Sequence, residues 1–146
     1  MTDTISIAAL VAEDLRSLAS KLKRKLRAQG HPGNLTASQA SVLVRLEKDG
    51  QMTTSALARA EGMRPQSMGA LIASLEASGL VVGMPDPSDG RQTILSLTED
   101  CRAMIAEGRA ARQDWLTRRI DATLSAEEQA QVHAAIVLLQ RLVEED

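Results

Sequence analysis

Apolar residues recur at spacings of three and four along the first 30 residues, which is the period of one face of an amphipathic helix. The pattern predicts a first helix that ends at "GHPGN", residues 30–34, because two glycines and a proline interrupt it there. Its apolar face would carry Val11, Leu15, Leu18, Leu22 and Leu26.

Helix-start and helix-stop residues predict three shorter helices in the next 50 residues. The first opens at Thr36, with Gln39 three positions later as in a capping box, and stops near residues 49–50. The second fits "TTSALARAE", residues 53–61, and the third begins near Pro65, a residue favoured in the first turn of a helix. The third helix runs to Gly79, and its apolar side would carry Met68, Leu71, Ile72 and Leu75.

The pattern then changes to short segments rich in branched residues. "LVVGM", residues 80–84, and "RQTILSLT", residues 91–98, are separated by the turn-forming run "PDPSDG", residues 85–90. Two such segments around a turn predict a β-hairpin.

Two long helices are predicted to finish the chain. One starts at Thr98 and runs to about Ile120, and the other starts at Ser125, where Glu128 completes a second capping box. The apolar positions of the last helix are Val132, Ile136, Leu139 and Val143.

Length and composition narrow the class of protein. A chain of 146 residues that is 44% hydrophobic and 25% charged has the size of one globular domain. Its apolar runs are far shorter than the ~20 residues that cross a bilayer, and acidic residues stand where a signal peptide carries basic ones, so we expect a cytoplasmic protein with no membrane partner.

Catalytic and metal-binding motifs are not found in the sequence. A single cysteine, Cys101, permits no internal disulfide, and His31 with His133 are too few and too far apart for a metal site. We find no nucleophile motif, no glycine-rich phosphate loop and no HExxH. We therefore expect no enzyme activity, no metal and no cofactor.

The formal net charge of −2 is unevenly distributed. It is +3 over residues 1–30, −3 over 31–100 and −2 over 101–146, and the densest cluster is "KLKRKLR", residues 21–27. This cluster is interpreted first as the solvated face of the first helix, with a nucleic-acid patch and a membrane-surface helix as alternatives.

Residues 54–79 have the spacing of a helix-turn-helix, with a core position at Leu57, small Ala58 where a second helix can cross, and Gly62 in the turn. A hairpin follows directly, which makes the pattern more specific. In this order of elements the chain resembles the MarR family of bacterial transcriptional regulators. The matching segments are "LTASQASVLVRL" (35–46), "LARAEGMRPQSMGALIASLEASGLV" (57–81) and "DPSDGRQTILSLT" (86–98).

The resemblance implies an all-α fold with a small β-hairpin wing, a winged helix-turn-helix that dimerises through its N- and C-terminal helices. Residues 1–146 would form a single MarR-type domain, in which 35–98 are the DNA-binding core and 5–30 and 99–146 are dimerisation helices. It further implies a homodimeric transcriptional repressor that binds double-stranded DNA at an inverted-repeat operator.

In a helix-turn-helix, the N-terminal residues of the second helix enter the major groove. In this chain those residues are Arg64, Gln66, Ser67, Gly69 and Ala70. Arginine suits a guanine edge or a phosphate, glutamine an adenine edge and serine a phosphate, while the two small residues let the backbone come close. The alternative is an exposed polar face at the start of a helix.

The hairpin would be the wing, with Arg91 near its tip. An arginine there can enter a narrow minor groove, and Asp89, two residues earlier, can orient its guanidinium group. The alternative is a loop with a local Asp–Arg pair of little energetic weight.

Two further functions stay open at this stage. One is a dimeric winged-helix protein that binds protein partners and has no DNA affinity, and the other is a redox sensor that acts through Cys101, which we expect to be buried. The family also commonly senses phenolic or aryl carboxylate compounds. We predict an effector pocket for a small aromatic or phenolic compound near Trp115 and Met104.

Overall fold

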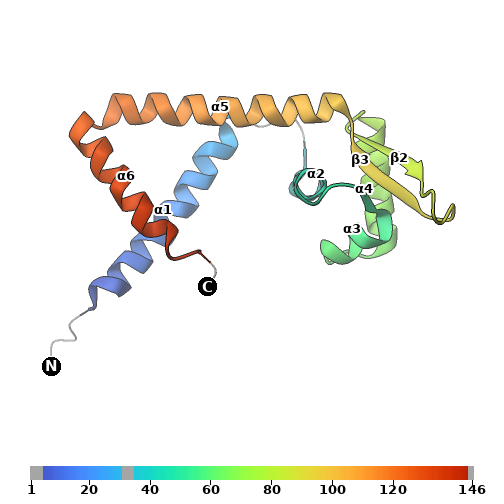
Figure 1. The fold of residues 1–146 in the computed structure, drawn as a ribbon, viewed down its shortest axis with the longest axis horizontal. Helices are drawn as coiled ribbons and strands as arrows, with labels where there is room; N and C mark the ends of the chain where they lie inside the picture. Colours follow the sequence, from blue (N-terminus) through green and yellow to red (C-terminus); the bar gives the residue numbers. More distant parts are fainter. Residues whose placement is uncertain (1–4, 31–34, 145–146) are drawn as a thin grey trace. The chain divides into compact units, whose positions relative to one another are not determined.

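The computed structural model describes residues 5–30 and 35–144 and divides into two compact units (Figure 1). One unit contains the described residues of 32–108, and the other contains those of 1–31 and 109–146. Residues 31–34 of the predicted "GHPGN" helix stop, which include His31, lie outside the described residues.

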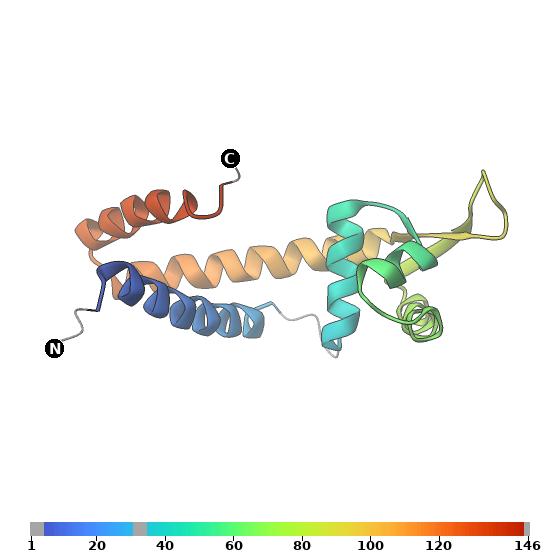
Figure 2. The same ribbon diagram turned by 90° about the horizontal axis from the view of Figure 1, so that it is seen from below.

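The unit of residues 32–108 contains short helices and a small sheet. Its elements are α2 (Ala37–Asp49), β1 (Met52–Thr53), α3 (Thr54–Ala60), α4 (Pro65–Ala77), β2 (Val81–Pro85), β3 (Thr93–Leu97) and the first part of α5 (Glu99–Thr123). The strands are antiparallel in the order β1-β3-β2, and β2 pairs with β3 from Val81 opposite Leu97 to Pro85 opposite Thr93. The tip between β2 and β3 projects away from α2, α3 and α4 in both views (Figures 1 and 2).

The predicted helices and the hairpin are confirmed, with one addition. Strand β1 was not predicted, because two residues are too few to show an alternating pattern. It pairs with β3 through Met52 opposite Leu95 and Thr53 opposite Ile94, so the sheet has three strands.

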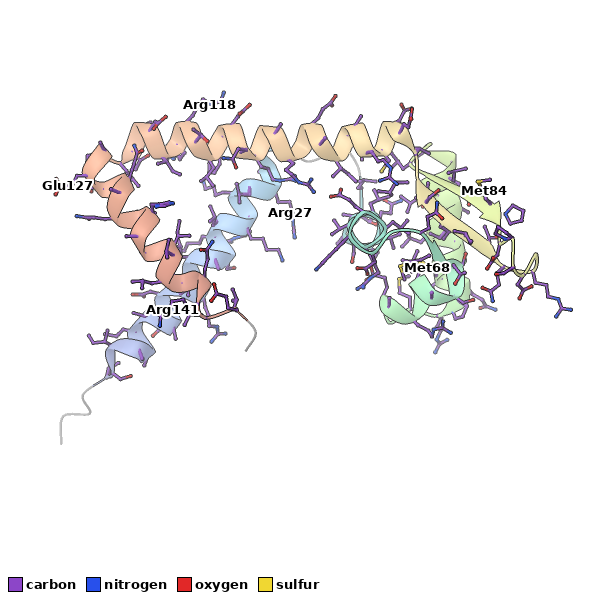
Figure 3. All side chains as sticks on the ribbon, in the orientation of Figure 1. Arg27, Met68, Met84, Arg118, Glu127 and Arg141 are labelled. Carbon is purple, nitrogen blue, oxygen red and sulfur yellow. The ribbon has the colours of Figure 1, made fainter. Side chains whose placement is uncertain are left out.

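The core of this unit is aliphatic and is built from its helices and from β2 and β3, with Met52 of β1 half-buried against it. Met68 is fully buried among α2, α3 and α4, whereas Met84 on β2 is 62% exposed (Figure 3). The buried side chains are Val42, Leu43, Leu46, Leu57, Ala58, Met68, Ile72, Leu75, Val81, Leu95, Leu97 and Cys101. A core that joins every element fixes how α4 and the hairpin lie relative to α2 and α3.

Local capping sets the ends of the helices. The Thr36 and Gln39 capping box is formed in full at the start of α2, as predicted. Three glycines with positive φ follow α2, α3 and α4, at Gly50, Gly62 and Gly79. Because side chains are strained at such φ values, these glycines end the helices where the sequence predicted.

The other unit contains α1 (Ile7–Ala28), the later part of α5 and α6 (Ala126–Gln140) (Figure 2). The Ser125 and Glu128 capping box at the start of α6 is formed as predicted, but α6 ends at Gln140, before Val143. No described residue of α1 or α6 is buried. Their apolar faces are therefore open to solvent in the isolated chain, with Leu18 and Leu138 each 60% exposed.

Candidate nucleic-acid interface

The turn between α3 and α4 is short and closely bonded. The Glu61 amide donates to the Leu57 carbonyl at 3.0 Å, and the Met63 amide donates to the Ala58 carbonyl at 2.9 Å. Gly62 between them has a φ of 64°, a conformation that glycine adopts at no steric cost. This turn places α4 directly against α3, as a helix-turn-helix requires.

Helix α4 begins with an exposed polar segment. Arg64 is its N-cap, in an extended conformation and without a side-chain capping bond, and Pro65 is the first helical residue. The structure brings all five predicted major-groove residues together at this exposed N-terminal half, namely Arg64, Gln66, Ser67, Gly69 and Ala70. Within residues 5–30 and 35–144, the side chains of Arg64 and Gln66 have no hydrogen bond or ion pair.

The opposite face of α4 is anchored to the rest of its unit. Met68, Ile72 and Leu75 are buried in the core. The Gln39 side-chain amide donates to Ser74 Oγ at 3.0 Å, and Ser74 Oγ donates to the Leu71 carbonyl at 2.6 Å. Gln39, which completes the capping box of α2, therefore also bonds to α4. The exposed face of α4 is thus fixed relative to α2.

A second polar network joins α2 to the end of α3. The Glu61 carboxylate accepts hydrogen bonds from Ser41 Oγ at 3.0 and 3.1 Å and from Arg45 Nε at 3.2 Å. Arg45 also contacts Asp49 at 3.4 Å, and the Glu61 side chain is only 13% exposed. Sequence reasoning missed this network, since the partners lie 16 to 20 residues apart and follow no motif.

The hairpin tip is shaped by its own aspartates. Asp86 Oδ1 accepts from Ser88 Oγ at 2.7 Å and from the Ser88 amide at 2.9 Å, and these bonds lower the pKa of Asp86 below its ordinary value. The Asp86 amide donates to the Gln92 carbonyl, and the Gln92 amide donates to the Asp89 carbonyl. These two hydrogen bonds close the loop.

Asp89 acts on Arg91 differently from the prediction. Asp89 Oδ1 accepts from the backbone amide of Arg91 at 3.1 Å, whereas no ion pair joins Asp89 to the Arg91 guanidinium in the described part of the chain. Because the carboxylate fixes the main chain of the turn, the exposed guanidinium keeps its donors for an external partner.

Arg59 is a candidate that sequence reasoning did not name. It lies in the last turn of α3 and is exposed, so Arg59 and Arg64 stand on the two sides of the Glu61–Met63 turn. The first helix of a helix-turn-helix crosses the DNA backbone, which makes Arg59 a candidate phosphate contact. A basic residue two positions before Glu61, at the end of the predicted helix of residues 53–61, was the signal that could have identified it.

Cys101 is fully buried in the core, as predicted. Burial raises the pKa of its thiol above the ordinary value, which disfavours the reactive thiolate. The described residues include no group of three or more potential metal ligands, and none of their helices is both long and apolar enough to cross a membrane.

The two residues of the predicted effector pocket lie in different units. Met104 is half-buried and packs against the core of the unit of residues 32–108. Trp115 is half-buried in the part of α5 that belongs to the other unit. The effector pocket stays a prediction.

Comparison with known proteins establishes the family. Residues 35–93 match the family model described as the MarR family. An HTH-type transcriptional regulator of Mycobacterium bovis is 39% identical over 137 residues, which are 94% of this chain and 95% of the relative. The chain belongs to the MarR family. It is therefore a helix-turn-helix transcriptional regulator by family, and its curated relatives are named as regulators and not as enzymes.

Solved structures confirm the MarR winged-helix fold. A transcriptional regulator from Pseudomonas aeruginosa is 34% identical, with a TM-score of 0.79 over 97% of this chain and 100% of that one. A MepR mutant of S. aureus bound to an oligodeoxyribonucleotide is 19% identical, with a TM-score of 0.72 over 91% of this chain and 97% of that one. The predicted fold class and the predicted family are both confirmed.

Proposed function

We propose that this MarR-family protein binds double-stranded DNA sequence-specifically, with α4 in the major groove and the β2–β3 tip at the adjacent minor groove. The observation that carries the proposal is the exposed N-terminal half of α4, whose Arg64 and Gln66 side chains have no partner among the described residues. The relatives named as HTH-type transcriptional regulators and the fold shared with the DNA-bound MepR mutant support it.

The residues divide into two roles. Arg59 and Arg91 are exposed cations on α3 and on the hairpin tip, suited to phosphates and to a narrow minor groove, where they give affinity and orientation. Gln66 stands in the first turn of α4, where it suits a base edge and gives sequence preference.

We further propose that the working form is a homodimer held by α1, α5 and α6. Fifteen large apolar side chains are markedly exposed in the described chain, and 12 of them belong to α1, α6 or the residues flanking these two helices. A second copy that covers these faces would remove this apolar surface from water. A two-fold dimer would read an inverted repeat with half-sites about one turn, 10 to 10.5 base pairs, apart.

The last part of the proposal is that a small molecule controls DNA binding. A phenolic or aryl carboxylate compound that binds beside Trp115 would favour a dimer geometry that no longer fits the operator, so the protein would act as a cytoplasmic repressor released by its effector. By linkage, operator DNA must weaken the ligand by the factor by which the ligand weakens DNA. Such compounds should change Trp115 emission at the concentrations that release DNA, and an unchanged emission with a broad panel would refute this part.

A gel shift tests DNA binding itself. The labelled probe is the duplex upstream of the protein's own gene, and the control is a scrambled duplex of the same length and composition. We expect a stable shift with the upstream duplex and a much weaker one with the scrambled duplex. Equal weak binding of both would instead support the rival function, a winged-helix protein that binds protein partners, for which the charge of −3 over residues 31–100 is the best argument.

A further inference from the structure

The outward face of α4 has an unusual composition for a surface that reads DNA. Gln66, Ala70, Ala73 and Ala77 follow one another at spacings of four, three and four, and all are exposed. With 3.6 residues per turn, this row lies opposite the buried face of Met68, Ile72 and Leu75. The row therefore belongs to the interface proposed above and is the part of α4 that would approach base edges.

Helix α4 carries no cation. From Pro65 to Ala77 the only charged residue is Glu76, and the nearest cation is Arg64 at the N-cap. Glu76 lies against Gly83 of β2, where its Oε1 is 3.3 Å from the place a Cβ of Gly83 would take. Arginine or lysine on guanine is the commonest base-specific contact, so α4 lacks the usual means of selecting a G·C pair along its outward face.

Gln66 is the one long polar side chain of the outward row. Its amide has no hydrogen-bond partner among the described residues, so both the carbonyl and the NH₂ group are available. A glutamine amide pairs in a bidentate manner with N6 and N7 of adenine, which present one donor and one acceptor in the major groove.

Ala70 and Ala73 offer only methyl groups to the major groove. The C5-methyl of thymine is the apolar group of that groove, and alanine is among the side chains that contact it. Ala73 lies seven residues after Gln66, a rise of roughly 10 Å along the helix, which corresponds to about three base pairs at 3.4 Å each. The anchoring of Ser74 by Gln39 keeps this row at a fixed distance from the core of its unit.

From this surface we infer that α4 selects A·T pairs at about three consecutive positions of each half-site. Gln66 reads an adenine, and Ala70 and Ala73 contact thymine methyl groups. Guanine recognition is then confined to Arg64, at one end of the row. The inference rests on the proposed function and specifies that the protein binds operators with A·T pairs in each half-site.

Selection from a pool of random duplexes tests the base preference with the full-length protein. We expect enriched sites that contain two half-sites about one turn apart, each with a run of A·T pairs at its centre. Enriched sites with G·C pairs throughout the centre of each half-site would overturn the inference and leave the proposed function intact. No enrichment of any sequence would overturn the proposed function itself.

Base analogues then test the thymine methyl contacts without changing the protein. In an enriched duplex, each central thymine is replaced by deoxyuridine, which removes only the C5-methyl group. We expect affinity to fall about fourfold at a contacted thymine, the factor that corresponds to about 0.8 kcal/mol for one buried methyl group. A thymine outside both half-sites is the matched control and should tolerate the replacement. Unchanged affinity at every central thymine would refute the contacts with Ala70 and Ala73.

Gln66 is tested by variants on the same duplexes. Gln66→Ala should make adenine and guanine nearly equal at one position and leave the preference at the thymine positions in place. Gln66→Glu should shift the preference at that position toward cytosine, because a carboxylate accepts from the cytosine N4 amino group. Wild-type base preference in both variants would show that Gln66 does not read a base. A circular dichroism spectrum of each variant checks that the helices are retained.

Discussion

Thr98, in the unit of residues 32–108, connects the start of α5 to the segment between α4 and β2. Its Oγ1 donates to the Gly79 carbonyl at 2.7 Å and accepts from the Cys101 amide at 3.1 Å. Its own amide donates to the Leu80 carbonyl at 3.1 Å. The hydroxyl therefore caps α5 and also ties the start of α5 to the residue that follows α4.

Thr98→Val removes the hydroxyl and keeps the shape of the side chain. Loss of a capping hydroxyl costs about 1 kcal/mol, within a range of about 0.5 to 2. The bond to Gly79 lies at the surface, where water can replace it, so it adds at most about 1 kcal/mol. We expect the free energy of unfolding to fall by about 1 to 2 kcal/mol in total.

Urea unfolding followed by circular dichroism measures this loss, with all variants at one protein concentration because a dimer unfolds in a concentration-dependent way. Thr98→Ser is the matched control, since it keeps both hydroxyl bonds and should stay within about 0.5 kcal/mol of the parent. A valine variant as stable as the parent, or a serine variant as unstable as the valine one, would refute the role assigned to the hydroxyl.

Three further predictions concern assembly, redox behaviour and pH. Size-exclusion chromatography with light scattering at micromolar concentration should give about twice the chain mass of 15.7 kDa, and the mass of one chain would contradict the dimer. Mild peroxide should leave DNA binding unchanged in the parent and in Cys101→Ser, because the thiol is buried; release from the parent alone would favour the redox function. Hydrogen bonds from the Ser125 amide and hydroxyl lower the pKa of Glu128 below its ordinary value of 4.5, so the α6 cap should be complete above that pH and lost as the pH falls through the lowered pKa. An NMR titration should show the lowered pKa of Glu128 in the parent and a partial return toward its ordinary value in Ser125→Ala, which removes the hydroxyl and keeps the backbone amide bond; a pKa equal to that of the parent would exclude the hydroxyl as a cause.

The elements that were predicted correctly are those whose signals are local. The Thr36 and Ser125 capping boxes, the glycines after α2, α3 and α4, and the turn run of residues 85–90 each act within a few residues, so the sequence shows them directly. Strand β1 was not predicted, because its two residues are extended through their pairing with β3, which the local sequence does not show.

The contacts that were missed depend on tertiary structure. The Glu61 network with Ser41 and Arg45 forms only when α2 lies beside the end of α3. Asp89 was predicted to orient the guanidinium group of Arg91. It does interact with Arg91, but through the backbone amide, because the turn brings that amide toward the carboxylate. The roles of Arg64, Gln66 and Arg91 toward DNA stay predictions, since they depend on a partner.

The salt dependence of binding to the upstream duplex tests the central claim most directly, namely that the hairpin tip and α4 contact DNA together. Each phosphate neutralised by a cation contributes about −0.9 to the slope of log K against log salt. Arg91→Ala should reduce the magnitude of the slope by about one, whereas Lys48→Ala, which removes an exposed cation from the end of α2, should leave it unchanged. Gln66→Ala should keep the slope and lose about 1 to 3 kcal/mol of preference over the scrambled duplex. Equal slopes for the parent and Arg91→Ala, together with unchanged preference in Gln66→Ala, would contradict the account.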